Sequence, residues 1–212
     1  RTPLRSLRLR AGGRALEVSA SGGRLVVDGR VAPSPLLLGE ADWEVRAEGA
    51  PARRYQAALR LEARAGRLAV EGTFALERYV AAVVASEAAP GTPPPALAAL
   101  AVVVRSWALA ARGRHDGGRR CDLAHCQVLR GDLSRGRREE ARAAAAVTAG
   151  QVLRLTDGRV AAAPFHAACG GHTADPRLAF GGEGTGAAAV PDPRCPPARW
   201  TARLTPRQVG AS

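Results

Sequence analysis

Residues 76–110 read LERYVAAVVASEAAPGTPPPALAALAVVVRSWALA, and this stretch decides the fold. Its first part carries apolar residues at the spacing of one helix face, and Pro90 ends that part. The recurring positions are Leu76, Tyr79, Val80, Val83 and Val84. This pattern predicts an amphipathic helix that begins near Leu76.

A second helix is predicted after the proline. Thr92 is placed to cap it, Pro93 to Pro95 suit its first turn, and Gly113 follows its end. The segment is apolar on nearly all sides, which is typical of a helix at the centre of a core. Its apolar residues include Leu97, Leu100, Val102, Val103, Val104, Trp107 and Leu109.

The flanking regions differ from this helical centre. Residues 1–74 alternate short apolar stretches with glycine and charge, which predicts antiparallel strands. Downstream we expect a loop over 113–131, a helix over about Arg137 to Val147, and a hairpin of Gln151–Leu155 and Val160–His166 around Asp157-Gly158. The predicted class is α+β, with a β-rich part over 1–74 and a helical core with a C-terminal hairpin and loop-rich end over 75–212.

Composition explains much of the charge. The formal net charge is +12, and all 31 basic residues are arginine, while Lys, Asn, Ile and Met are absent. These four residues share codons rich in adenine and thymine, so the pattern indicates a GC-rich genome rather than a selected binding face. No basic stripe with interleaved aromatic residues accompanies the charge, so we predict no nucleic-acid partner. An anionic wall polymer would suit the same charge.

The chain opens on Arg1 without a signal-peptide pattern, which is what a mature or trimmed fragment would show. Its longest apolar run, Ala96 to Ala111, contains Arg105 and is shorter than a membrane span. We therefore expect a soluble fragment.

Glu87 is the first candidate for chemistry. It follows Val84 and Val83 by three and four residues, which places its carboxylate on the apolar helix face near the helix end. Burial there would raise the pKa of a carboxyl, as a general acid near neutral pH requires. The alternative is a structural carboxylate paired with an arginine such as Arg105.

Two cysteines and two histidines gather in the loop that follows. His115, Cys121, His125 and Cys126 supply the ligand types of a tetrahedral zinc site, although their spacing is not that of a zinc finger. A Cys121–Cys126 disulfide, or free thiols beside solvated histidines, remains an alternative. The other two cysteines, Cys169 and Cys195, are expected to form a disulfide that staples loop segments in an oxidising compartment.

A third cluster spans His166 to Thr173. A histidine at a strand end, followed by Gly170-Gly171 and a threonine hydroxyl, permits close approach of a ligand to the backbone. An ordinary strand exit with a capped turn would look the same.

The order of these motifs resembles the stage II sporulation protein D family. The resemblance covers about residues 65–205 and rests on LERYV at 76–80, VVASE at 83–87, PALAALA at 95–101, VRSWA at 104–108, CDLAHCQV at 121–128 and the segment 166–173. That family includes peptidoglycan lytic transglycosylases and related amidase enhancers. The resemblance implies that Glu87 is the catalytic glutamate of an E-x-x-P turn, here Glu87 to Pro90. Many relatives carry Met directly after the glutamate, where this chain has another apolar residue, Ala88. The resemblance also implies structural zinc in the Cys/His loop.

The chemistry implied by the resemblance needs one carboxylate rather than the usual pair. The 6-hydroxyl of the substrate's own muramyl sugar attacks the anomeric carbon and gives a 1,6-anhydro product. Glu87 would protonate the glycosidic oxygen and then accept the hydroxyl proton. No convincing second catalytic carboxylate is present, and Asp122, the nearest candidate, is expected to orient a loop histidine. Sugar contacts are expected from Gln127, His166, Thr173 and Arg105, with the first helix and the His166 turn facing one groove.

Two classes of function follow from the resemblance. The first is a lytic transglycosylase that cleaves the MurNAc–GlcNAc bonds of peptidoglycan glycan strands. The second is a non-catalytic wall-binding protein that stimulates a partner N-acetylmuramoyl-L-alanine amidase. Either way we expect an extracytoplasmic protein, secreted or membrane-anchored in its full-length form. Zinc is a candidate structural metal, and no organic cofactor is expected.

Overall fold

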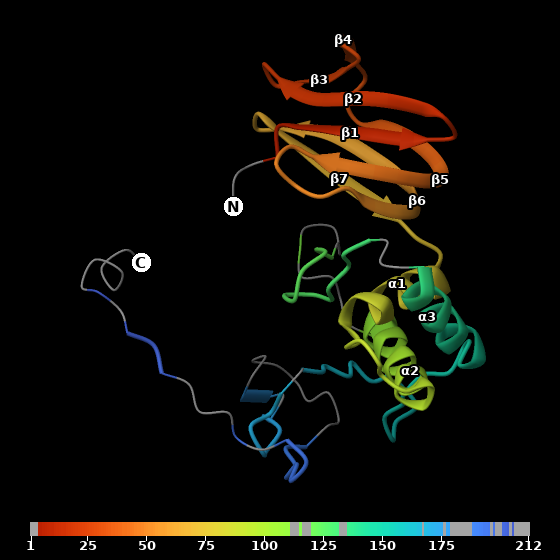
Figure 1. The fold of residues 1–212 in the computed structure, drawn as a ribbon, viewed down its shortest axis with the longest axis vertical. Helices are drawn as coiled ribbons and strands as arrows, with labels where there is room; N and C mark the ends of the chain where they lie inside the picture. The colour runs from red at the N-terminus through yellow and green to blue at the C-terminus, as the bar shows by residue number, and fades with distance from the viewer. Residues whose placement is uncertain are drawn as a thin grey trace.

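The structure of the protein is a computed structural model. The structure describes residues 4–110, 115, 120–131, 135–166, 168–175, 177–178, 188–195, 197, 201–203 and 205. A β-sheet near the N-terminus and three helices form two layers, with loop segments beyond them (Figure 1). The α+β class predicted from the sequence, with its β-rich start, is therefore confirmed.

The N-terminal part is a seven-stranded antiparallel sheet in the order β4-β3-β2-β1-β5-β6-β7. Its short connections follow from local sequence: Asp28 and Gly29 both take positive φ, as a two-residue turn between strands requires. The strands are β1 (Ser6–Ala11), β2 (Arg14–Ser21), β3 (Arg24–Val27), β4 (Arg30–Ala32), β5 (Leu36–Ala47), β6 (Arg53–Arg64) and β7 (Arg67–Thr73).

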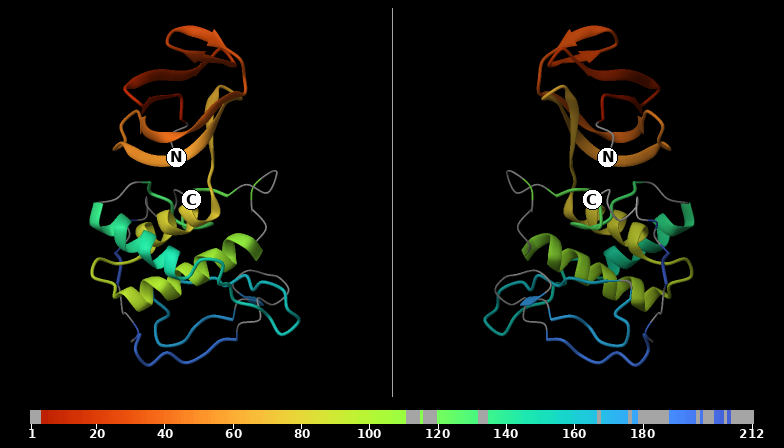
Figure 2. Two further views of the ribbon diagram at one scale, coloured as in Figure 1. Left: turned by 90° about the vertical axis from the view of Figure 1, so that its right-hand side faces the viewer. Right: turned by 90° about the vertical axis from the view of Figure 1, so that its left-hand side faces the viewer.

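The sheet curls around its own core. Strand β1 alternates buried Leu7 and Leu9 with exposed Arg8 and Arg10, which is the two-residue period of a sheet with one buried face. Strand β2 contacts β6 and β7 although neither is its neighbour in the sheet, and Figure 2 shows the curl. The buried core comprises Leu7, Leu9, Val18, Leu25, Ala57, Leu59, Leu61 and Leu68.

Helices α1 (Leu76–Glu87), α2 (Pro94–Ala110) and α3 (Arg135–Val147) pack against one another. The two prolines that open α2 fit because the first turn of a helix needs no N–H donors. The shared core is aliphatic and small, which lets the helices approach closely. It contains Val80, Val83, Val84, Leu97, Ala101, Val104, Leu129, Ala141, Ala144 and Ala145 among its buried residues.

Three aromatic rings join the sheet to α1. Tyr55 on β6 contacts Phe74 edge to face at 6.3 Å between ring centroids, and Phe74 contacts Tyr79 of α1 in the same manner at 6.3 Å. Such pairs stabilise by about 1 kcal/mol each beyond the area they bury. The first helix is therefore oriented by the sheet that precedes it.

The C-terminal hairpin is shorter than predicted. A single bridge joins Arg154 and Val160 around the turn at Asp157 and Gly158, and no strand continues to His166. Of the helices in the described part of the chain, none combines the length and apolar character that crossing a bilayer requires.

Candidate functional site

Glu87 is the last residue of α1, and its side chain is half-buried. Its Oε1 accepts a hydrogen bond from the backbone N–H of Val128 at 2.7 Å. The helix period brings it to the face that carries buried Val80, Val83 and Val84, as the sequence indicated. One carboxylate oxygen of Glu87 is thus held by the loop that follows the Cys/His motif.

Ser86 provides a second attachment for the same loop. Its Oγ accepts from the backbone N–H of Arg130 at 3.0 Å and donates to the carbonyl of Ala82 at 2.7 Å. Leu129, between the two attached amides, is buried in the helical core. The last turn of α1 therefore fixes the backbone of residues 128–130.

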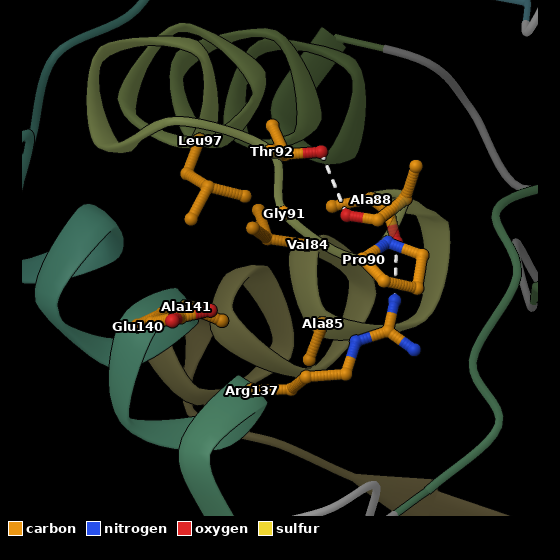
Figure 3. Close-up of a pocket in the computed structure, with 11 residues that line it drawn as sticks. Val84, Ala85, Ala88, Pro90, Gly91, Thr92, Leu97, Arg137, Glu140 and Ala141 are labelled. Atoms are coloured by element: carbon orange, nitrogen blue, oxygen red, sulfur yellow. Dashed lines mark hydrogen bonds between the residues drawn. The ribbon is translucent and has the colours of Figure 1, made fainter.

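A residue of α3 is hydrogen-bonded to the turn after Glu87. The Arg137 guanidinium donates to the carbonyl of Ala88, and Thr92 Oγ1 donates to the carbonyl of Ala89 at 2.8 Å (Figure 3). The cavity behind this turn has a volume of about 20 Å³. That space holds about one water molecule, so it is no sugar subsite.

Gln127 is a structural residue rather than the sugar contact that the sequence predicted. It is 2% exposed, its Oε1 accepts from the Tyr79 hydroxyl at 2.8 Å, and its Nε2 donates to the Val104 carbonyl at 3.5 Å. Burial raises the pKa of Tyr79 to about 12. The hydroxyl therefore stays protonated and donates throughout the physiological range.

The four predicted metal ligands lie together. One ligand atom from each of His115, Cys121, His125 and Cys126 lies within 4.8 Å of all the others. Cys126 Sγ is 3.6 Å from His115 Nε2 and 3.9 Å from His125 Nδ1. The sharp backbone bend that neighbouring ligands require is a turn closed by the Cys126 N–H on the Leu123 carbonyl at 2.9 Å.

This donor set fits zinc. Two sulfurs and two imidazole nitrogens are the ligands of a tetrahedral structural site, whose donor atoms lie roughly 3.3–3.8 Å apart when bound. Both cysteines are thiols in the structure. The loop can therefore hold a metal ion, and the Cys121–Cys126 disulfide stays an untested alternative.

Asp122 does not orient a loop histidine, contrary to the prediction. Its carboxylate accepts from Arg53 Nη1 of β6 at 2.9 Å, and its carbonyl accepts the Leu129 N–H at 3.1 Å. Beside it, Gly131 has φ of +76°, and a Cβ there would lie 2.9 Å from the Arg54 carbonyl oxygen. The sheet thus contacts the Cys/His loop directly.

Arg105, predicted from the sequence as a sugar contact or as the partner of Glu87, pairs with Glu77 instead. Its side chain is 1% exposed, and it donates to both carboxylate oxygens of Glu77 at 2.8 and 2.6 Å. It donates further to the carbonyls of Ala145 and Gln151, both at 3.1 Å. The bond from Arg105 lowers the pKa of Glu77, and the pair ties α1, α2 and α3 together.

His166 and Thr173 lie in the C-terminal part of the chain, after the three helices. His166 is exposed in an irregular segment, and the Thr173 hydroxyl accepts the N–H of Val190 at 2.8 Å. Residues 160–166 and 168–175 lie on the side of α2 away from the sheet, whereas loop 120–131 lies on the sheet side (Figures 1 and 2). The single groove expected between Glu87 and these segments stays a prediction.

Cys169 and Cys195 approach each other as thiols. The Cys169 N–H donates to Cys195 Sγ at 3.2 Å, and Cys169 Sγ faces Asp192 Oδ2 at 3.5 Å. Burial raises the pKa of the Cys169 thiol. The pKa of Cys195 is lowered by hydrogen bonds from backbone N–H groups, chiefly that of Cys169. The disulfide remains a prediction, and Asp192 was not anticipated from the sequence.

Several residues around Glu87 escaped sequence reasoning. The helical spacing predicts only that Tyr79 lies on the apolar face, and no sequence pattern predicts the contacts of Ser86, Val128 and Arg137. Val128 acts through its backbone amide, for which no side-chain signal exists. Ser86, directly before the candidate glutamate in the last turn of a helix, is a sequence feature from which a side-chain bond to a neighbouring backbone could have been predicted.

Comparison with known proteins assigns part of the chain to a family. Residues 64–155 match the family model SpoIID, described as stage II sporulation protein. No curated protein and no solved structure gives a significant match. The matched stretch contains α1, α2, the Cys/His loop and α3, and it supports a cell-wall-related function of the sporulation-protein kind.

Proposed function

Residues 64–155 belong to the stage II sporulation protein (SpoIID) family, and from this membership we propose that the chain is a peptidoglycan lytic transglycosylase. It cleaves the MurNAc–GlcNAc bonds of glycan strands and leaves 1,6-anhydro-muramyl ends. Glu87 serves in turn as general acid and general base. The observation that carries the proposal is the held carboxylate of Glu87 at the end of α1.

The two carboxylate oxygens of Glu87 have different roles in this proposal. Oε1 accepts the Val128 N–H at 2.7 Å, which leaves Oε2 to carry and transfer the proton. A single orientation of the carboxylate matters because proton transfer requires a donor within hydrogen-bond reach of the glycosidic oxygen. Ser86 supports this orientation by fixing the neighbouring amide of Arg130.

The reaction then balances with one carboxyl group. Oε2 delivers its proton to the bridging oxygen as the bond from the muramyl anomeric carbon to that oxygen breaks. The muramyl 6-hydroxyl oxygen bonds to the same anomeric carbon, and its proton passes to the Glu87 carboxylate. Glu87 returns to its protonated form, and no water is consumed. The usual second carboxylate of glycosidases is not needed, because the nucleophile comes from the substrate.

The Cys/His loop has a positioning role in this proposal. His115, Cys121, His125 and Cys126 would hold zinc, and a structural zinc ion supplies a cross-link that stabilises the fold around it. The chain passes from Cys126 to Val128 in two residues, so the backbone that holds Glu87 begins where the cluster ends. No step of the reaction involves the ion.

The second candidate function is a non-catalytic enhancer of a partner amidase. The observation that favours it is that the bonds of Ser86 and Glu87 to residues 128–130 would also serve a purely structural purpose. Under this alternative, Glu87 fastens a loop and the protein binds glycan strands without cleaving them. Both candidates act on the cell wall outside the cytoplasm.

The deciding experiment follows the products from purified glycan strands by mass spectrometry, with intact and peptide-stripped strands in parallel. We expect anhydro-muramyl ends from the unaltered protein and their loss in Glu87→Gln. Glu140→Gln is the matched control, since Glu140 is an exposed carboxylate near the same turn. Strands that are bound but stay intact with the unaltered protein would refute the transglycosylase and favour the enhancer.

A further inference from the structure

A second cluster of potential ligands lies in the C-terminal part, on segments 169–173 and 190–195. These segments are held side by side by backbone hydrogen bonds: Asp192 N–H donates to the Gly171 carbonyl at 2.8 Å, and Thr173 N–H donates to the Val190 carbonyl at 2.9 Å. A turn within the second segment is closed by the Cys195 N–H on the Asp192 carbonyl at 3.1 Å. The backbone that carries the cluster is therefore defined on both sides.

The side chains converge between the two segments. Ligand atoms of Cys169, Asp192 and Cys195 all lie within 4.8 Å of one another, and all three residues are partly buried. The carboxylate is oriented, because Asp192 Oδ1 accepts the Arg194 N–H at 3.1 Å while Oδ2 faces Cys169 Sγ at 3.5 Å. Cys195 Sγ accepts the Cys169 N–H at 3.2 Å.

We propose that Cys169, Asp192 and Cys195 form a second metal site, which binds a divalent ion of the zinc class. Two thiolates and one carboxylate are ligands that zinc takes, and three protein ligands leave a fourth position for a solvent molecule. Binding releases the thiol protons to solvent, and the two thiolates and the carboxylate leave the bound site with one net negative charge.

The carboxylate distinguishes this site from the disulfide expected from the sequence. A disulfide uses the two sulfurs alone and would leave Asp192 Oδ2 directed at an uncharged S–S bond. A metal ion would bind all three groups. The Cys169 N–H donates to Cys195 Sγ and the Arg194 N–H donates to Asp192 Oδ1, and such hydrogen bonds hold metal ligands in position. The inference rests on this geometry and is independent of the reaction proposed for Glu87.

The test measures metal content per chain in the full chain, purified with a non-thiol reductant and zinc, then dialysed. To isolate this site, the measurement is made in a Cys121→Ser/Cys126→Ser background, where the first cluster lacks its sulfurs. We expect one zinc equivalent to remain there and to be lost on adding Cys195→Ser or Asp192→Asn. Cobalt in place of zinc should give sulfur-to-metal charge-transfer absorption that Cys195→Ser weakens.

Two results would overturn the proposal. One is the absence of zinc and of cobalt absorption in the reduced double-serine background when circular dichroism shows a folded chain. The other is a Cys169–Cys195 cross-linked peptide in unreduced protein, combined with no metal uptake after reduction. Asp192→Asn keeps the test decisive if a cysteine variant fails to fold, since it preserves size and both thiols.

Discussion

The carboxylate of Glu87 and the backbone amide of Val128 are joined by a 2.7 Å hydrogen bond across 41 residues of sequence. The acceptor ends a helix, and the donor lies in the loop two residues after Cys126. The orientation of the candidate catalytic group therefore depends on a loop that also contacts Ser86 and the sheet.

This dependence can be tested by removing the amide. Val128→Pro deletes the N–H and leaves Glu87 in place, whereas Val128→Ala keeps the N–H and removes only side-chain volume. A hydrogen bond to a charged group stabilises by about 1.5–3 kcal/mol, so kcat of Val128→Pro should fall by about 10- to 100-fold. Release of anhydro-muramyl ends measures kcat, and thermal unfolding shows whether the variant folds. Equal activity in the two variants would mean that the bond does not position Glu87.

Arg105 should dominate the stability of the helical part. Arg105→Met leaves the buried carbonyl of Ala145, the carbonyl of Gln151 and both carboxylate oxygens of Glu77 without their donor. This loss should lower the free energy of unfolding by about 3 kcal/mol. The matched control is Arg8→Met, whose pair with Glu17 is solvent-exposed and should change stability by about 0.5 kcal/mol or less. Urea unfolding compares them, and similar losses would contradict the structural role of Arg105.

The Glu77–Arg105 pair should also make stability depend on pH. Because Arg105 lowers the folded-state pKa of Glu77, the pair stabilises the fold above the unfolded value of about 4.3. This stabilisation is lost as pH falls through the lower folded pKa. Glu77→Gln should therefore be less stable than the unaltered chain at pH 7, with the difference shrinking under acid. Urea midpoints across this range test the sign, and a gap that widens on acidification would refute it.

Metal removal should loosen the loop that holds Glu87. Zinc bound to the folded state alone raises its stability in proportion to the logarithm of zinc concentration over Kd. Chelation should then lower the thermal midpoint of the chain, and zinc should restore it. In Cys121→Ser/Cys126→Ser, the part of this response that comes from the first cluster should vanish. An unchanged response in the double variant would show that the first cluster does not bind the ion.

Local patterns in the sequence predicted the helices and the position of Glu87. The apolar spacing of Val80, Val83 and Val84 belongs to one helix, so the face that carries Glu87 could be derived from neighbouring residues alone. The Cys/His cluster was also predictable, because its ligands lie within one loop.

Pairings between distant residues could not be derived in this way. Glu77 and Glu87 lie at opposite ends of α1, and the sequence alone does not say which of them pairs with Arg105. In the structure Arg105 pairs with Glu77, and it also donates to the Ala145 carbonyl of α3. Gln127 is a polar loop residue that sequence alone places at the surface, yet the Tyr79 hydroxyl satisfies it in the interior. His166 and Thr173 lie in irregular backbone, whose path no local sequence pattern encodes.

The sheet has a consequence for how the protein can be divided. The family match begins at residue 64, where β6 ends, so a fragment starting there keeps β7 but loses the strand that pairs with it. Such a fragment would expose a lone strand edge open to aggregation. It would also lose Arg53 and the Arg54 backbone, against which Asp122 and Gly131 rest. A fragment limited to the matched residues 64–155 would therefore lack contacts that the sheet supplies in the whole chain.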